Sequence, residues 1–157
     1  MTDHDHWTEA EVDDLMGRAA AVMSLAVDRN SFEAAMEMVA VIDRYGNAGV
    51  YSLCMCFAEI VHGHATAGMP AEARAGATAV VLTEPGAPEP SGKARALLWA
   101  ARFVAAYAND DDQQTMALFL APLEGGRPDH ARLNVAALLG MAADLVRAAA
   151  AKTGGRT

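Results

Sequence analysis

A four-residue phrase, alanine followed by a charged residue, a large apolar residue and valine, occurs three times in this chain. It stands at residues 58–61 (AEIV), 101–104 (ARFV) and 143–146 (ADLV), so successive copies are 43 and 42 residues apart. A period of about 40–47 residues is the length of the HEAT and armadillo repeats, which are built from packed helices. The spacing therefore predicts helical hairpins that stack side by side.

The composition agrees with a helical fold. Apolar residues make up 53% of the 157 residues, and many of them are alanine, which has the highest helix propensity. Runs rich in β-branched and aromatic residues with period-two alternation, which are typical of strands, are absent. A chain of this length fits one domain with a core of its own. We therefore expect a single all-α domain.

Capping and breaking residues divide the chain into seven predicted helices. The expected architecture is an N-terminal helix and three helical hairpins, stacked as a short HEAT/TPR-like superhelix; a compact irregular helical bundle is the alternative. Residues 1–7 would be a flexible acidic arm, 8–152 the single domain and 153–157 a frayed tail. The seven helices are expected at residues 8–27, 31–45, 50–67, 70–82, 91–108, 109–122 and 129–152.

The second residue of the phrase is charged in every copy, as Glu59, Arg102 and Asp144. If the hairpins stack in order, Arg102 would lie between two carboxylates. The pattern favours a lateral ion-pair ladder that fixes the register of the repeats, with less than about 1 kcal/mol expected for each exposed pair. The functional alternative is a charged binding groove on the same surface.

Charge and cysteine usage bear on compartment and partners. The net charge is −8, and six acids with no Lys or Arg fall within the first 14 residues. An acidic chain lacks the electrostatic attraction that drives most nucleic-acid binding, and it is also repelled by anionic membranes. The start of the chain is acidic where a signal peptide would be basic and then apolar, and two cysteines are too few for a disulfide framework. We expect a cytoplasmic protein without nucleic-acid or membrane partners.

Two groups of residues resemble metal sites when read as letters. Glu59 and His62 form the Glu-x-x-His unit of two-metal bundles, but no second unit exists. Cys54, Cys56, His62 and His64 would lie on one helix, spread over about 15 Å of its axis, and cannot converge on one zinc ion. Neither a metal nor a cofactor is expected.

Methionines are spread over most of the predicted helices, where they can fill core gaps or line adaptable apolar surfaces. Met36 and Met38 are two residues apart and cannot face the same side of one helix. One of them is therefore expected at the surface or at an interface.

Three functions remain open. The first is an interaction module that binds another protein or itself, for example as a homodimer, through a helical face or groove. The second is a helical bundle that binds an effector or small ligand in a pocket lined by Trp99, Phe103, Tyr107, Met141 and their neighbours. The third is an enzyme, for which no converging catalytic set is visible and no catalytic residue is assigned. The candidate ligand- or partner-binding residues are Trp99, Phe103, Tyr107, Glu59, Arg102 and His62.

Overall fold

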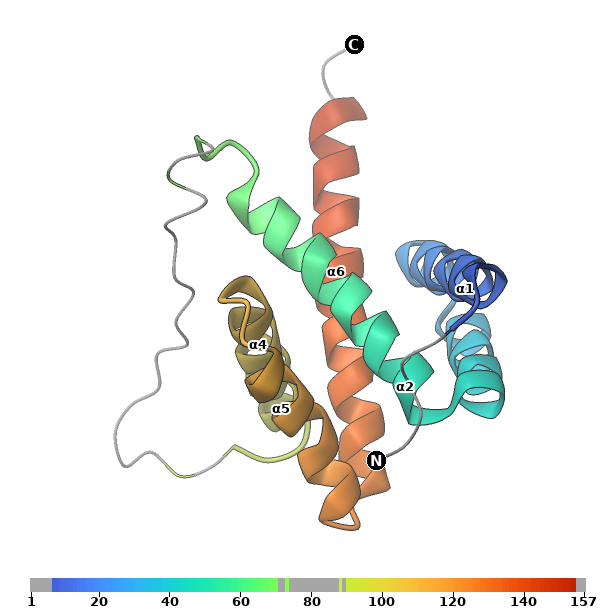
Figure 1. Cartoon of the computed structure of the whole chain (residues 1–157). Helices are drawn as coiled ribbons and strands as arrows, with labels where there is room; N and C mark the ends of the chain where they lie inside the picture. The colour runs from blue at the N-terminus through green and yellow to red at the C-terminus, as the bar shows by residue number, and fades with distance from the viewer. Residues whose placement is uncertain (1–6, 71–72, 74–87, 89, 155–157) are drawn as a thin grey trace.

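The computed structural model describes residues 7–70, 73, 88 and 90–154, and in this part of the chain the protein is all-helical, as the sequence predicts. Five helices are present in the described residues, where the sequence predicts seven over the whole chain (Figure 1). The predicted arm at residues 1–7, apart from Trp7, and the predicted helix at 70–82, apart from residues 70 and 73, lie outside the described residues. The helices are α1 (Glu9–Val27), α2 (Ser31–Thr66), α4 (Gly92–Ala108), α5 (Asp112–Glu124) and α6 (Pro128–Gly154).

The first helix begins where its capping residues predict. The Thr8 hydroxyl accepts a hydrogen bond from the Glu11 amide, and the Glu11 carboxylate accepts one from the Thr8 amide at 2.8 Å. This reciprocal pair satisfies two amides that a helix start otherwise leaves without a partner. The hydrogen bonds from Thr8 also lower the pKa of Glu11. From this start, Leu15, Ala19 and Val22 recur at helical spacing and form the buried face of α1.

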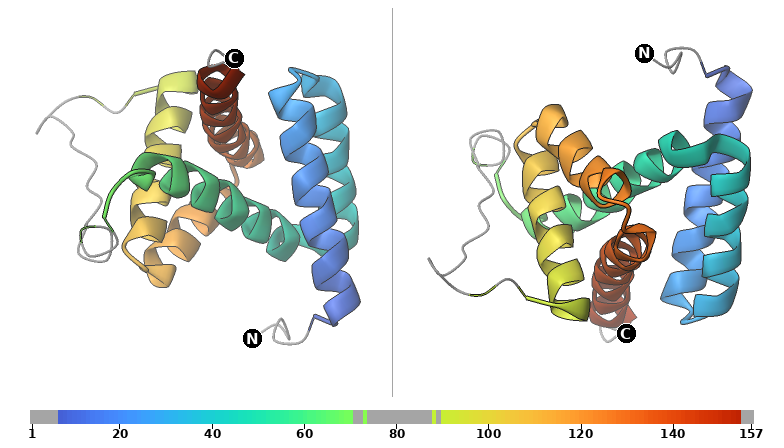
Figure 2. Two further views of the ribbon diagram at one scale, coloured as in Figure 1. Left: turned by 90° about the horizontal axis from the view of Figure 1, so that it is seen from above. Right: turned by 90° about the horizontal axis from the view of Figure 1, so that it is seen from below.

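Two predicted helices, at residues 31–45 and 50–67, are one kinked element in the structure. Gly46 alone interrupts α2, with φ 61° and ψ −153°, and the helix resumes directly after it. Only glycine adopts this backbone region readily, because it has no Cβ. The first half of α2 runs beside α1, and the second half crosses the molecule toward α4 (Figures 1 and 2). The break predicted between residues 45 and 50 is therefore present at Gly46, but it is a kink within one element and not a loop between two separate helices.

The predicted HEAT/TPR-like superhelix is not confirmed. In a solenoid each repeat contacts only its neighbours. Here α6 contacts α1, α2, α4 and α5, so the last helix touches the first one (Figure 2). The described helices thus pack around α6, because that helix offers apolar residues on several sides.

The repeated phrase does not present the same face in its three copies. Ala58 and Ala143 are buried, whereas Ala101 is only half-buried and its neighbour Phe103 takes the fully buried position. The middle copy is therefore rotated relative to the other two. The phrase identifies helices correctly, but it does not define a common packing column.

The core is centred on aromatic residues from α2, α4 and α5. Trp99 and Phe103 stack with ring centroids 5.1 Å apart, and Tyr51 meets the edges of Phe103 and Phe119. Full burial of one such side chain contributes about 1.5–3 kcal/mol. This cluster fixes α4 and α5 on one side of α6 and leaves the first half of α2 on the other.

Among the described helices, α6 alone is long and apolar enough to cross a membrane by length and composition. A central helix of a bundle passes the same test, and one third of the relevant stretch is buried here. Because α6 contacts every other described helix, its apolar composition already has a structural cause.

Candidate functional site

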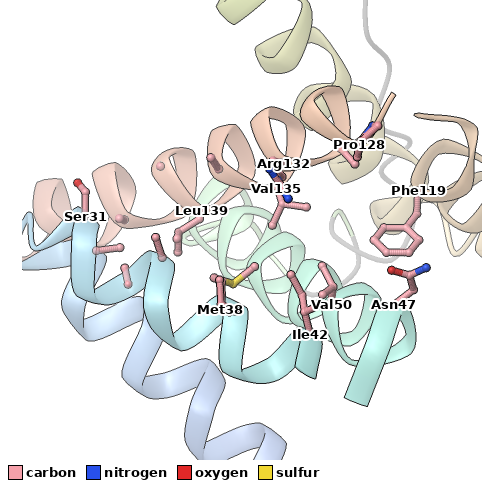
Figure 3. Close-up of a pocket in the computed structure, with 18 of the residues that line it drawn as sticks. Ser31, Met38, Ile42, Asn47, Val50, Phe119, Pro128, Arg132, Val135 and Leu139 are labelled. Atoms are coloured by element: carbon pink, nitrogen blue, oxygen red, sulfur yellow. The ribbon is translucent and has the colours of Figure 1, made fainter. Parts of the chain in front are cut away.

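A groove of about 790 Å³ lies between the first half of α2 and α6 (Figure 3). The tip of α5 and the end of α1 close parts of it. Its lining is mostly apolar, with small residues on both walls. The residues that line it include Ala26, Arg29, Ala35, Met38, Val39, Ile42, Pro128, Arg132, Val135, Ala136, Leu139, Gly140, Asp144 and Arg147.

The α2 wall is a regular apolar helix face. Ala35, Met38, Val39 and Ile42 follow the i, i+3, i+4, i+7 spacing that places side chains on one side of a helix. Met38 is half-buried and packs on the core, whereas Val39 is 46% exposed and Ile42 is 44% exposed. The wall is therefore apolar and still accessible from solvent.

The same helix continues the apolar surface outside the groove. Phe32 is 71% exposed and Met36 is 51% exposed, and together with Val39 and Ile42 they form one row along α2. We call Phe32, Met36, Val39 and Ile42 the α2 stripe. Because Met36 is exposed and Met38 is not, the prediction that one of these methionines lies at the surface is confirmed.

The α6 wall is hollowed by small residues. Val135 and Leu139 point into the groove beside Ala136 and Gly140, and a Cβ built on Gly140 would meet nothing within 4 Å (Figure 3). Leu133 on the same helix is 46% exposed, but it is not among the residues that line the groove. The exposed large apolar residues of the groove walls, Val39 and Ile42, therefore belong to α2.

The charges at the groove differ in sign from the chain as a whole. Arg29, Arg132 and Arg147 line it against one acid, Asp144, although the whole chain has a net charge of −8. Arg147 is held in place, since it pairs with Asp144 and donates hydrogen bonds to α1. Arg132 is exposed and pairs with Asp129 at 3.5 Å. The lining is a locally basic strip on an acidic molecule.

The six candidate binding residues predicted from the sequence lie outside the groove. Trp99 and Phe103 are buried in the core, and the Trp99 indole donates a hydrogen bond to the Leu118 carbonyl at 2.8 Å. The Tyr107 hydroxyl donates to the Glu59 carboxylate at 2.6 Å, and its ring meets the edge of His62. None of these residues lines the groove. Their role in binding stays a prediction.

Tyr107 and Glu59 form a local unit on the surface of α2 and α4. Burial raises the pKa of Tyr107, and the hydrogen bond to Glu59 raises it as well, so that together they bring it to about 12. A phenol that stays protonated this far into the alkaline range is a hydrogen-bond donor at neutral pH. The unit therefore holds α2 to α4 by a charge-assisted hydrogen bond.

The ion-pair ladder predicted for the repeated phrase is not formed. Glu59, Arg102 and Asp144 are all exposed, and within the described ranges Arg102 has no acid within 4.0 Å. Glu59 accepts from Tyr107 instead, and Asp144 pairs with Arg147 on its own helix. The ladder fails because the three helices do not stack in order.

The part of the chain that is described contains no group of three His, Cys, Asp or Glu residues placed to hold a metal ion. Cys54 is fully buried, and burial strongly raises the pKa of its thiol. Cys56 is half-buried, and burial raises its pKa as well. High thiol pKa values disfavour the thiolate that metal binding and nucleophilic chemistry require.

One signal in the sequence does point to the groove. Residues 31–42 (SFEAAMEMVAVI) are apolar at nine of twelve positions, which is more than one buried helix face needs. Ala34 and Val41 fill the buried face, so the remaining apolar residues need a second partner.

Comparison of the chain with protein-family models, with curated proteins and with solved structures gives no match.

Proposed function

We propose that this protein is an interaction module that binds an amphipathic helix of a protein partner in the groove between α2 and α6. The observation that carries this proposal is the continuity of the α2 stripe with the groove wall. Val39 and Ile42 belong to both, so one occupant contacts the stripe and the groove together. Large exposed apolar surfaces on a small domain mark interaction sites.

The length of the groove favours a helix. On α6 its lining extends from Pro128 to Arg147, which corresponds to about 28 Å at 1.5 Å per residue. A helix of about five turns has this length. A drug-sized molecule would occupy only part of it.

The exposed apolar residues beside the groove favour the same occupant. Phe32 and Met36 continue the row of Val39 and Ile42 outside the groove and stay exposed unless the occupant extends beyond it. A helix with its side chains is about 10–12 Å across, wide enough to contact the groove wall and this row together. This is the helix-in-groove mode of recognition, in which anchors at i, i+3, i+4 and i+7 enter an apolar channel.

A display library of helical peptides tests the proposal. The protein is immobilised at low density, so that single chains are presented, and peptides of about 20 residues are selected against it. We expect enriched peptides with apolar anchors at helical spacing and acidic residues beside them. Their affinity should fall at least about tenfold in Val39→Glu, because a carboxylate would be desolvated against the anchors.

Ala20→Glu is the matched control. Ala20 is exposed on α1 and lies outside the groove, so the substitution adds the same charge to another helix face. Both variants should keep the helical circular-dichroism spectrum of the parent. If no peptide is enriched, or if Val39→Glu and Ala20→Glu bind the selected peptides equally well, the proposal is wrong.

A small apolar ligand is the second candidate, and the volume of the groove favours it. Pockets for small molecules usually measure about 300–1,000 Å³, and about 790 Å³ falls within this range. The arginines would suit an acid group at one end of such a ligand. A ligand present at 100 times its Kd should stabilise the fold by about 2.7 kcal/mol, which thermal unfolding with a series of fatty acids would detect. Filling the groove with Gly140→Leu should remove that shift.

A further inference from the structure

We infer that the helix that fills the groove is the α2 stripe of a second copy of this chain, so that two chains dock face to face in a symmetric dimer. This inference rests on the proposed function and names the partner of the same site. It adds a requirement that the proposed function lacks, namely that the stripe is itself a ligand.

The stripe and the groove lie on one face of the molecule and share a wall. Val39 and Ile42 line the groove, and Phe32 and Met36 continue the same row outward. A two-fold axis through such a face brings the stripe of each copy to the groove of the other. Symmetric dimers are built from self-complementary patches of this kind.

The stripe has the properties that the groove requires of an occupant. It is the exposed apolar row of a helix, with its members three or four residues apart from Phe32 to Ile42. An acidic residue, Asp43, follows its last member directly, and Asp43 is exposed. The groove, in contrast, is lined by arginines, among them Arg29 in the turn between α1 and α2. Apolar surface and charge are therefore both complementary between the two parts.

Symmetry sets the register of these charges. In a dimer whose two-fold axis is perpendicular to α2, the two stripes run antiparallel. With Phe32 opposite Ile42 of the second copy, Asp43 then lies opposite Ser31. Arg29 stands two residues before Ser31, in the turn that leads into α2, and we expect its long side chain to reach Asp43 from there. Across the described chain neither Arg29 nor Asp43 has an ion-pair partner within 4.0 Å. Each dimer would contain two ion pairs, one from Arg29 of each copy to Asp43 of the other.

The apolar contacts supply most of the stability of this dimer. An exposed ion pair contributes little to stability, because water screens its charges, whereas burying a large apolar side chain contributes several times more. The charges select the antiparallel register and the partner, since a like charge at the same place repels. Affinity and specificity can thus be tested by separate substitutions.

Sedimentation equilibrium and light scattering over a range of concentrations measure the association. For the parent chain of 16.4 kDa we expect the mass of a dimer at about 100 μM chain, and a fall toward the monomer on dilution. Val39→Glu should weaken the dimer at least about tenfold, and Ala20→Glu should leave it unchanged. Both positions are exposed, so neither change disturbs the core.

A charge exchange between two variants tests the register. Arg29→Asp alone and Asp43→Arg alone should each weaken self-association about three- to tenfold, because each places like charges opposite one another twice. Mixing the two variants should restore association, since the mixed dimer contains an Asp–Asp chain and an Arg–Arg chain and both of its pairs attract. The double variant Arg29→Asp/Asp43→Arg should also associate like the parent.

A chain that stays monomeric at about 100 μM would overturn the dimer. A dimer that survives Val39→Glu, or variants that do not associate on mixing, would overturn the assigned face. Neither result touches the peptide selection, which uses isolated chains. If selected helices bind the groove of a monomeric protein, the proposed function stands and its partner is another protein.

Discussion

Arg147 on α6 donates a hydrogen bond to the backbone carbonyl oxygen of Ala26 at the end of α1, with an N–O distance of 2.8 Å. It donates a second one to the carbonyl of Val27 at 3.1 Å. The last carbonyls of a helix have no partner within that helix, and they carry the negative end of its dipole. A guanidinium from the last helix therefore caps the first helix and closes one end of the groove.

Replacing Arg147 should destabilise the whole fold. We expect Arg147→Met to lower the free energy of unfolding by about 1–3 kcal/mol, because two hydrogen bonds from a charged donor are lost, although the Ala26 carbonyl keeps the one from the Arg29 amide at 3.1 Å. Urea denaturation followed by circular dichroism measures this change. Arg132→Met is the matched control, since Arg132 is an exposed arginine on the same helix, and it should change stability by less than about 0.5 kcal/mol. Equal effects of the two substitutions would contradict the capping role.

Local patterns predict much of this fold, because their causes lie within a few residues. The capping box at Thr8 and Glu11 and the all-α class follow from neighbouring residues alone. The contact of Arg147 with Ala26 joins residues 121 positions apart, and nothing in the sequence near either one indicates it. The order of the helices in space depends on such long-range contacts. The spacing of the repeated phrase along the chain therefore could not show whether the helices stack as a superhelix.

The groove was missed for a related reason. Aromatic residues attract attention as binding residues, but Trp99 and Phe103 offer the most apolar area and are therefore the first to be buried. The residues that stay exposed, such as Phe32 and Val39, differ from core residues only in what packs against them. Excess apolar surface on residues 31–42 is visible in the sequence, whereas the face left open is decided by the packing of α1 and α6.

Gly46 should be irreplaceable at the kink of α2. Its φ of 61° and ψ of −153° are unfavourable for every residue with a Cβ, so Gly46→Ala should cost about 1–3 kcal/mol of stability. The cost would come from the backbone alone, because a Cβ at this position meets nothing within 4 Å. Differential scanning calorimetry would report it as a lower melting temperature.

At Gly63, in the same helix, a substitution by alanine is expected to have the opposite effect on stability. It has regular helical conformation, and a Cβ there also meets nothing within 4 Å. Gly63→Ala should therefore stabilise the protein by about 0.5–1 kcal/mol. If the two substitutions shift the melting temperature in the same direction, the kink at Gly46 does not have the conformation described.

The hydroxyl groups of Tyr51 and Thr115 should be energetically coupled. They are 2.8 Å apart, Thr115 is fully buried, and its hydroxyl also reaches the Asp112 carbonyl at 2.9 Å. Thr115→Val keeps the shape and removes the hydroxyl, so it should cost about 1–2 kcal/mol by leaving polar groups without partners. In a double-mutant cycle with Tyr51→Phe, the double variant should lose less than the sum of the single variants. Strict additivity would show that the two hydroxyls do not interact.

Alkaline pH should weaken the contact of Tyr107 with Glu59. Burial and the hydrogen bond raise the pKa of Tyr107 from its ordinary value of 10.0 to about 12 in the folded protein. A raised folded-state pKa means that the stabilisation is complete below pH 10 and is lost as the pH rises toward 12, because the unfolded chain releases the phenol proton first. Unfolding free energies measured across this window should fall more steeply for the parent than for Tyr107→Phe. In an ultraviolet titration of the phenolate, Glu59→Gln should move the Tyr107 step to lower pH, since a neutral amide no longer opposes ionisation. If the step disappears in Tyr107→Phe but does not move in Glu59→Gln, burial alone raises this pKa and the carboxylate contributes nothing to it.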